Sequence, residues 1–191
     1  MTARTKWTAL MLCIILLFAA GCADSVPVLD KNPVKPTTVP GKPENSGTPA
    51  QESMRITVYH ATKDAMNLVP EIHAVDKNDN PARTAILLLT AEPTDKNLMR
   101  VMPVSTRLLN LKIQNGVAYA NFSPNLKRFG GGSSTELLLV SAIVNTLTEF
   151  PEIKAVQILI DGKKADTLAG HVDISEPLSR SESIIKRTKT N

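Results

Sequence analysis

The sequence predicts a single small domain of the α+β class, in which a mostly antiparallel sheet is packed by two helices in the order ββαββαββ. Three observations predict this fold: strand-like alternation near residue 54, a tight-turn signal whose register fits the apolar pattern around it, and two apolar segments with helix boundaries. The chain has 191 residues, 42% of them hydrophobic, which suits one domain with appendages. Its two cysteines, Cys13 and Cys22, are too few for a disulfide scaffold or a cysteine-based zinc module.

The first two elements are predicted to be strands. Residues 54–60 alternate apolar and polar side chains and are rich in residues that favour β-structure. Residues 68–75 carry the same pattern more weakly. Pro70 favours an edge position for this second strand, because proline has no N–H group to donate to a neighbour.

The first helix is predicted over residues 82–91. Asn80 and Pro81 suit the N-cap and the first helical position. The segment itself is rich in leucine and alanine, and Pro93 follows it. Because proline cannot continue a helix, we expect the helix to end before that residue.

The dipeptide Asn115-Gly116 predicts a type I′ hairpin turn. A two-residue turn pairs residue 114 with 117, 113 with 118, 111 with 120 and 109 with 122. The apolar residues that this register places on one face, as part of the predicted core, are Leu109, Leu111, Ile113, Ala118, Ala120 and Phe122. The opposite face is mostly polar, so the turn and the hydrophobic pattern agree on the register.

The second helix is predicted over residues 137–150, after the glycine run at 130–132. Ser133 and Glu136 have the spacing of a capping box. The apolar stripe is broad, which indicates a helix that is buried on most of its surface. The remaining predicted elements are a strand over 153–160, a two-residue turn at Asp161-Gly162 and a returning strand over 163–168.

The net charge of +4 belongs to the ends of the chain. Residues 54–178 carry 13 basic and 13 acidic side chains, so the predicted domain is neutral. A nucleic-acid-binding domain needs a net positive face to displace counterions from phosphates. The sequence therefore argues against a nucleic-acid partner.

Residues 1–21 have the features of a bacterial lipoprotein signal peptide. Two basic residues precede 12 uncharged apolar residues, 9–20, which is the length of a secretory hydrophobic region and short for a membrane-spanning helix. The stretch Ala19-Ala20-Gly21-Cys22 resembles a lipobox, so Cys22 is the predicted lipidation site. An ordinary signal peptide with an incidental cysteine and an uncleaved membrane anchor are the alternatives.

Residues 22–53 are predicted to form a tether between the lipidated Cys22 and the domain at 54–178. Six prolines and the lack of periodic apolar residues predict a disordered, partly polyproline II segment. As a flexible coil it would reach about 30 Å. Residues 179–191 carry four basic side chains and one acidic side chain, and they are predicted to be a basic flexible tail.

The sequence contains no recognisable constellation of catalytic or cofactor-binding residues, and we expect no cofactor and no metal. The histidines His60, His73 and His171 lack the spacing of metal ligands. His171 and Asp173 could share a metal ion only if His60 or His73 folded beside them. The glycine run at 130–132 lacks the lysine of a P-loop. We therefore expect a protein that is not an enzyme, with a glycosidase-type pair of carboxylates as the enzymatic alternative.

Several stretches of residues 54–178 form a recognisable set. They are Leu87-Leu88-Leu89, Met102-Pro103, and residues 115–118, 122–123, 145–151, 158–162 and 168–175. Together they resemble the GerM domain of bacterial sporulation and germination lipoproteins. The chain departs from the family pattern at Glu92, where glycine is common, at Ser105, where the family favours Gly-Thr, and at Asn121, where it favours aspartate. The last departure removes a carboxylate and weakens any metal or catalytic role at that position.

The resemblance implies a non-enzymatic envelope protein that acts in sporulation, germination or envelope assembly. GerM domains are similar to ring-building motifs, which are small α+β modules that help to assemble membrane-associated complexes. The implied protein is lipid-anchored on the extracytoplasmic face of the cell membrane, where it contacts envelope proteins or assembles with itself. The alternatives are a module that binds peptidoglycan or another envelope ligand, and an enzyme that acts on the envelope.

Replacing Cys22 by serine should abolish lipidation, because the cysteine sulfur is the atom that would receive diacylglycerol. A single acyl chain binds membranes only marginally, so stable anchoring requires two or three chains. Metabolic labelling with a palmitate analogue measures the modification directly. Equal labelling of the wild type and Cys22→Ser would contradict the prediction.

Overall fold

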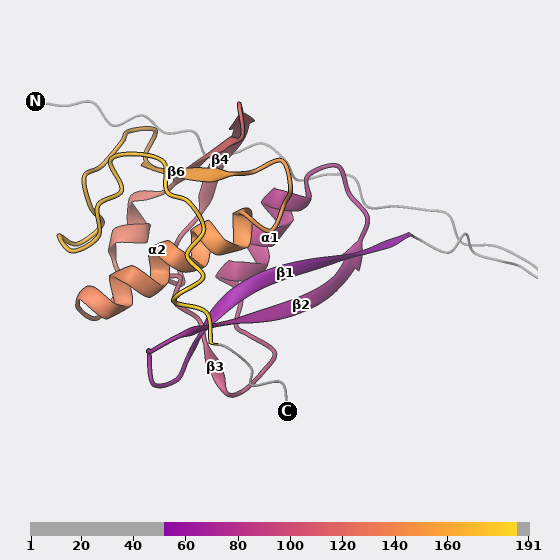
Figure 1. Cartoon of the computed structure of the whole chain (residues 1–191), viewed down its shortest axis with the longest axis horizontal. Coiled ribbons are helices and arrows are strands. Elements are labelled where there is room, and N and C mark those ends of the chain that lie inside the picture. Colours follow the sequence, from indigo (N-terminus) through magenta and orange to yellow (C-terminus); the bar gives the residue numbers. More distant parts are fainter. Residues whose placement is uncertain (1–51, 187–191) are drawn as a thin grey trace, which may run out of the picture. The chain divides into compact units, whose positions relative to one another are not determined.

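Two small sheets and two α-helices make up the structure, a computed structural model in which residues 52–186 are described. The elements in chain order are β1 (Ser53–Thr62), β2 (Leu68–Asp76), α1 (Pro81–Thr90), β3 (Leu98–Met99), β4 (Leu108–Gln114), β5 (Val117–Phe122), the 3-10 helix η1 (Pro124–Lys127), α2 (Ser133–Leu147) and β6 (Ala155–Ile160) (Figure 1). The predicted signal peptide at 1–21 lies outside the described residues, and so does the predicted tether up to residue 51.

The first sheet has the strand order β2-β1-β3. Strands β1 and β2 pair antiparallel without interruption from Ser53 opposite Asp76 to Ala61 opposite Leu68. Both strands were predicted from the sequence, and Pro70 lies on an edge strand as expected. The short β3 pairs with the end of β1 and was not predicted.

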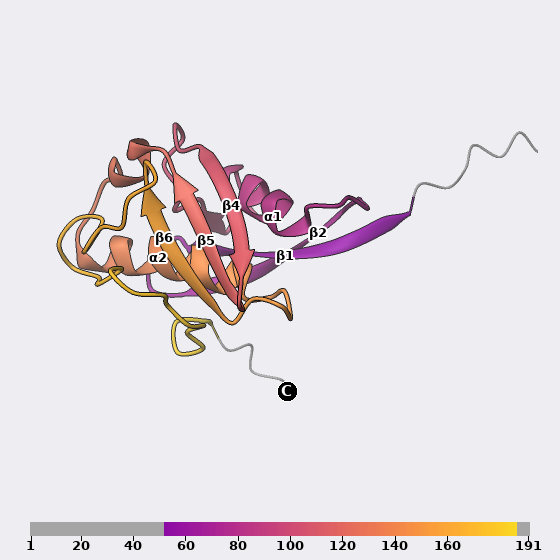
Figure 2. The ribbon, with the colours of Figure 1, turned by 90° about the horizontal axis from the view of Figure 1, so that it is seen from above.

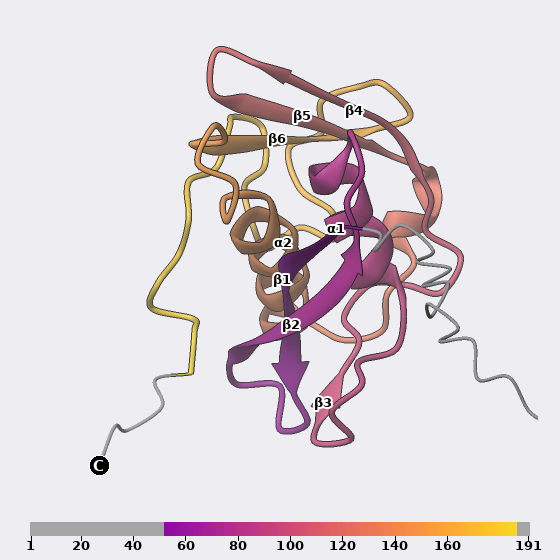
Figure 3. The ribbon, with the colours of Figure 1, turned by 90° about the vertical axis from the view of Figure 1, so that its right-hand side faces the viewer.

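The second sheet has the strand order β4-β5-β6, and Figure 2 shows its three strands side by side. Strands β4 and β5 form the predicted antiparallel hairpin, whereas β5 and β6 are parallel. A parallel pair needs a long crossover connection, and α2 lies in the segment that joins these two strands. The α+β class is confirmed, although the predicted single sheet is divided into two, and the helices lie between them (Figure 3).

The hairpin follows the predicted register only near its turn. Asn115 and Gly116 have φ values of 52° and 77°, as a type I′ turn requires, and the three predicted pairs nearest the turn are confirmed. The fourth is wrong, because a β-bulge places Leu108 opposite Phe122. Leu108 is therefore buried, with 7% of its surface exposed, while Leu109 is 42% exposed. Leu109 does not belong to the core.

Both predicted helices form. Helix α1 has Pro81 at its first position, although Asn80 makes no capping bond with its side chain. In helix α2 nearly every residue after the first turn is buried, which confirms the expected breadth of contact. Gly131 precedes it with a φ of +117°, and a Cβ there would lie 2.2 Å from Thr135 Oγ1. Glycine is therefore required where the chain turns into α2.

The predicted capping box is wrong, because Gly132 is the N-cap of α2 and no side chain caps the helix. Glu136 is instead fully buried. Its carboxylate accepts backbone N–H bonds from Leu168 (2.9 Å), Ala169 (2.9 Å) and His171 (3.0 Å). Burial acts to raise the pKa of Glu136, but these donors outweigh it and the pKa lies below its ordinary value. The carboxylate holds the segment after β6 against the start of α2.

This contact explains why the predicted strand over 163–168 is absent from the described fold. Within residues 163–168, only Lys163 pairs with β6, through an isolated bridge to Ile160. Leu168 and Ala169 donate their backbone N–H groups to Glu136, and Ile174 O accepts a bond from Gln157 Nε2 (2.9 Å). The segment is thus held by side chains of α2 and β6 and runs as an irregular loop.

Residues 179–186 do not form the predicted flexible tail. Leu178 exchanges two backbone hydrogen bonds with Val156 of β6, and Leu68 of β2 bonds in the same way to Ile184 and Lys186. Ile184 and Ile185 also pack against the main core. Basic composition suggested a solvated tail, but these apolar residues and paired backbone groups fix the segment to both sheets. Residues 187–191 lie outside the described range.

The bulge provides a sharp test of the hairpin core. Leu108→Asp should destabilise the protein by about 3 kcal/mol or more, because it places a charge in a buried position. Leu109→Asp, the neighbouring control, should change stability by less than about 1 kcal/mol, because the side chain is exposed. Thermal or urea unfolding of the full chain measures both variants, and equal losses would contradict the observed register.

Glu136 should make stability depend on pH. A carboxyl group whose pKa is lowered by folding contributes stability above its unfolded pKa, near 4.5, and this contribution is lost as the pH falls through the lower folded value. Glu136→Gln should cost roughly 2–3 kcal/mol at pH 7, since it removes bonds to a charged acceptor. Urea unfolding at a series of pH values should show that the gap between wild type and variant narrows below pH 4.5. A gap that stays constant would contradict this role.

Candidate functional site

The outer edge of strand β4 has no backbone pairing in the described part of the chain. The strand pairs only with β5. The outer edge of β6 is bridged by Leu178 at Val156, and that of β2 contains Pro70 and is bridged by the C-terminal segment at Leu68. The outward N–H and C=O groups of β4 therefore have no strand neighbour among residues 52–186, and such an edge can accept another strand.

Apolar side chains accompany this open edge. Leu109 is 42% exposed and Ile113 is 41% exposed, although both were predicted to lie in the core. Ile113 does lie on the predicted apolar face of the hairpin, but its side chain stays partly exposed near the turn end of β4. A hollow of about 410 Å³ separates β4 from the start of α1. Its lining includes Asp79, Arg83, Asn110, Leu111, Ile113 and Glu152.

A second feature is a cluster of three potential metal ligands on the first sheet. In the β1–β2 register His60 lies opposite Val69, and Glu71 and His73 follow Val69 at two-residue steps along β2. Side chains two residues apart share a face of a strand. The pairing therefore brings His60, Glu71 and His73 to one face of the sheet, where their ligand atoms lie within 4.8 Å of one another.

Glu71 is the centre of this cluster. Its Oε2 lies 2.9 Å from Nε2 of His73 and 3.7 Å from Nε2 of His60. Its Oε1 accepts three hydrogen bonds from the loop after α1, from Thr94 N (2.8 Å), Thr94 Oγ1 (2.5 Å) and Asp95 N (2.9 Å). One carboxylate oxygen is thus held by the loop, and the other faces the two imidazoles.

The electrostatics of the cluster favour a carboxylate beside neutral imidazole. Burial acts to raise the pKa of Glu71, but the bonds from Thr94 and Asp95 and the nearby histidines lower it overall. Burial lowers the pKa of His60, because desolvation disfavours the charged imidazolium. Neutral imidazole and carboxylate are the forms that bind metal ions.

His60 is the unusual member of the cluster. It is fully buried, yet neither ring nitrogen has a hydrogen-bond partner among the described residues. An unsatisfied buried polar group costs about 1–3 kcal/mol. His73 is 17% exposed, so the cluster extends from the buried His60 to the surface.

This cluster could not be predicted from the sequence, because a loop whose length does not fix the strand register separates His60 from Glu71 and His73. The alternation in Glu71-Ile72-His73 was the available signal. The predicted alternative was a metal site shared by His171 and Asp173 with His60 or His73. In the structure, His171 and Asp173 are not part of the cluster that contains His60 and His73. His171 is exposed, and it contributes its backbone N–H to Glu136.

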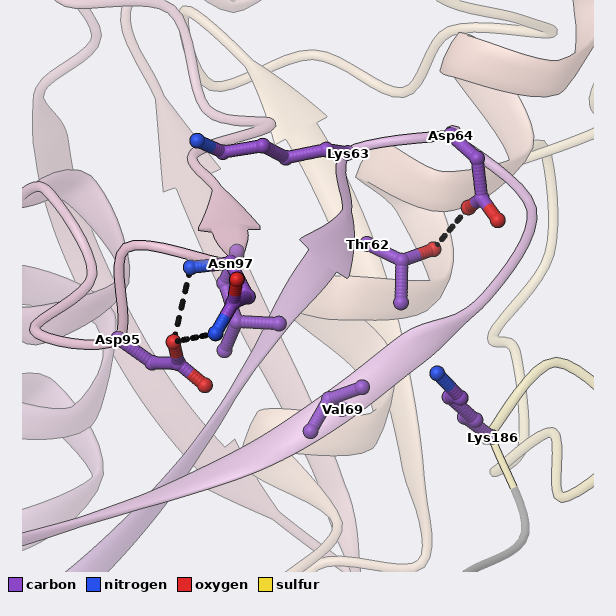
Figure 4. Close-up of a pocket in the computed structure, with 8 residues that line it drawn as sticks. Thr62, Lys63, Asp64, Val69, Asp95, Asn97 and Lys186 are labelled. Atoms are coloured by element: carbon purple, nitrogen blue, oxygen red, sulfur yellow. Dashed lines mark hydrogen bonds between the residues drawn. The ribbon is translucent and has the colours of Figure 1, made fainter.

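A third feature, a pocket of about 570 Å³, lies beside the β1–β2 turn. Figure 4 shows Lys63, Asp64, Asp95 and Lys186 around it. Both carboxylates make local hydrogen bonds, Asp64 with Thr62 Oγ1 (2.5 Å) and Asp95 with the Asn97 backbone N–H (2.8 Å). With two lysines and two aspartates, the lining has no net charge that would select an anion or a cation.

Tyr59 is not available as a sugar-stacking residue. It is 3% exposed, and its hydroxyl donates to Glu149 Oε1 (2.7 Å) and accepts from Arg180 Nη2 (2.6 Å). The Arg180 guanidinium also lies 5.2 Å from the centre of the Tyr59 ring. Burial raises the pKa of Tyr59. The residue connects β1 to α2 and to the C-terminal segment.

The predicted lipidation site Cys22 lies outside the described residues. Within residues 52–186, neither helix has both the length and the apolar character needed to cross a membrane.

Known structures share this fold. A structure of the tandem GerMN domains of the sporulation protein GerM from Bacillus subtilis matches with a TM-score of 0.59 and 24% identity, over 67% of this chain and 46% of that one. The first GerMN domain of the same protein matches with a TM-score of 0.58 and 25% identity, over 66% of this chain and 98% of that one. The chain therefore spans less than half of the tandem structure.

A Clostridium perfringens protein classed as a lipoprotein is also similar, with a TM-score of 0.50 and 27% identity over 66% of this chain and 87% of that one. No curated protein matches the sequence significantly. The family model described as "Germane: Sporulation and spore germination" matches residues 57–166. That range covers more than half of the sequence and contains β4, the histidine cluster and Glu136, and the chain therefore belongs to the Germane family.

Proposed function

We propose that the protein is a lipoprotein of the cell envelope whose Germane domain is a non-enzymatic module for protein–protein contact. Cys22 anchors it to the extracytoplasmic face of the membrane, and residues 22–53 tether the domain to that anchor. The free edge of β4 is the contact surface. Its partner is an envelope protein or a second copy of the chain, and the process is sporulation, germination or envelope assembly.

The observation that carries this proposal is the open, partly apolar edge of β4. Leu109 and Ile113 expose about two fifths of their surfaces, and beyond the bulge the strand is regular from Asn110 to Gln114. An extended segment of a partner can pair with such an edge through backbone hydrogen bonds, while its side chains occupy the hollow beside α1.

Membership of the Germane family supports the location and the process. The similarity to a Clostridium perfringens protein classed as a lipoprotein agrees with the lipobox-like sequence that ends at Cys22. The neutral charge of residues 54–178 agrees with a protein partner and argues against nucleic acid.

The enzymatic and glycan-binding alternatives have less support. The histidine cluster contains no serine or cysteine nucleophile, and it holds a single carboxylate, Glu71, where a glycosidase-type site needs two. Binding of peptidoglycan would be favoured by a groove with exposed aromatic rings. Neither described hollow is lined by an aromatic residue, and Tyr59 is buried.

The double variant Leu109→Asp with Ile113→Asp should lose function without unfolding. Two new charges at an exposed edge oppose the docking of an apolar partner segment but cost the fold little. Complementation of a deletion strain measures function, and circular dichroism of the full chain confirms the fold. Met66→Asp replaces a side chain that is 66% exposed in the β1–β2 turn, and this matched control should complement normally.

Position-specific crosslinking identifies the partner in the same cells. A photoreactive residue at the exposed Lys112 should give a discrete adduct, and the double variant should reduce its yield at least tenfold. Full complementation by the double variant would contradict the proposed contact surface. A folded His171→Ala variant that fails to complement would instead indicate a ligand or catalytic site near His171.

A further inference from the structure

We propose that His60, Glu71 and His73 form a binding site for a divalent transition-metal ion, with Zn²⁺ as the best-suited ion. Two imidazole nitrogens and one carboxylate oxygen are a recurrent ligand set for zinc sites with an open fourth position. The inference does not depend on the proposed function, because it rests on the first sheet and not on β4.

The distances within the cluster are close to those around a bound zinc ion. Zinc–nitrogen and zinc–oxygen bonds of about 2.0–2.2 Å place the ligands of a tetrahedral site roughly 3.3 Å apart. Here Glu71 Oε2 lies 2.9 Å from His73 Nε2 and 3.7 Å from His60 Nε2, and the whole set lies within 4.8 Å. Small side-chain rotations are sufficient to close these atoms around an ion.

The carboxylate is already oriented for coordination. Three donors from Thr94 and Asp95 hold Oε1 of Glu71, which leaves Oε2 directed at the two imidazoles. Hydrogen bonds to the second oxygen of a ligating carboxylate are the usual outer shell of a metal site. The loop after α1 therefore performs a positioning role.

His60 supplies the independent reason to place a ligand here. A fully buried histidine with no partner for either nitrogen among the described residues is uncommon, because buried polar groups are normally satisfied. A metal ion bound to Nε2 would satisfy the nitrogen that points towards Glu71. This arrangement places the remaining ring proton of each histidine on Nδ1.

The site has a route to solvent and an open coordination position. His73 is 17% exposed, so an ion can enter from that side. Three protein ligands leave the fourth position to water or to a side chain of a partner. Because the ligands come from β1 and β2 and Glu71 is bonded to the loop after α1, a bound ion would also strengthen the connection between these three segments.

Zinc titration of the full chain in detergent tests the site. The metal-free protein should bind one equivalent of Zn²⁺ by isothermal titration calorimetry and by metal analysis after desalting, and its Tm should rise. Mg²⁺ should not compete, because it prefers all-oxygen octahedral sites. Co²⁺ in place of Zn²⁺ should give the strong visible absorption of a four-coordinate site.

Variants separate this site from adventitious binding. His73→Ala should weaken Zn²⁺ binding by at least about 100-fold and remove the rise in Tm. His171→Ala, which changes an exposed histidine outside the cluster, should bind zinc like the wild type. His60→Gln should also weaken Zn²⁺ binding and remove the rise in Tm, provided that this variant folds. If it does not fold, the result for His73→Ala is sufficient to test the site.

Two results would overturn the proposal. One is the absence of stoichiometric zinc binding to the wild type. The other is equal binding by the wild type and His73→Ala, which would place the ion elsewhere on the chain. Complementation by the β4 variants tests the proposed function separately, so the two proposals can fail independently.

Discussion

The burial of one carboxylate determines how the second half of the domain is arranged. Glu136 lies in the first turns of α2 with no exposed surface, and a buried charge is tolerated only when it is fully hydrogen-bonded. Backbone N–H groups between Leu168 and His171 provide those bonds. The chain after β6 must therefore return across the start of α2. This return leads to Ile174, whose carbonyl accepts a hydrogen bond from Nε2 of the buried Gln157.

The C-terminal segment then closes the structure over both sheets. Ser181 exchanges hydrogen bonds with the Asn145 side chain through its N–H and C=O groups (both 2.9 Å). Arg180 contacts Glu149, two residues after the end of α2, and Tyr59 on β1. Burial acts to lower the pKa of Arg180, but its bonds to Glu182 and Tyr59 and the nearby charges raise it overall, so the guanidinium stays charged. Arg180 therefore acts as a structural connection between this segment, β1 and the residues after α2.

Local signals in the sequence were sufficient for most elements, and their limits have physical causes. The Asn115-Gly116 turn fixed the register of its nearest pairs, but no local feature revealed that an extra residue would enter the strand at Leu109. Ser133 and Glu136 have the correct spacing for a cap, yet a more distant backbone segment offers the carboxylate more donors than one helix end can. In the case of Glu136 a tertiary contact prevailed over a local preference.

The histidine cluster shows the same limit at the level of a site. Each of its residues was visible in the sequence, and the strands that carry them were predicted correctly. Only the offset of the β1–β2 pairing, with His60 opposite Val69, brings them together. A shift of one residue would turn His60 to the opposite face of the sheet from Glu71 and His73. A site on paired strands can therefore be predicted only when the strand register is known as well as the positions of the strands.

The two proposed sites lie on different sheets, and this separation has a functional consequence. A partner paired with β4 would extend the second sheet, whereas an ion at His60, Glu71 and His73 would link strands of the first sheet to the loop after α1. Neither occupant uses the other's ligating atoms or edge. The neutral domain also gives little long-range attraction for a partner. Under the proposed anchoring, confinement near the membrane raises the effective concentration of the domain and its partner. A modest contact along one strand can then form without long-range electrostatic attraction.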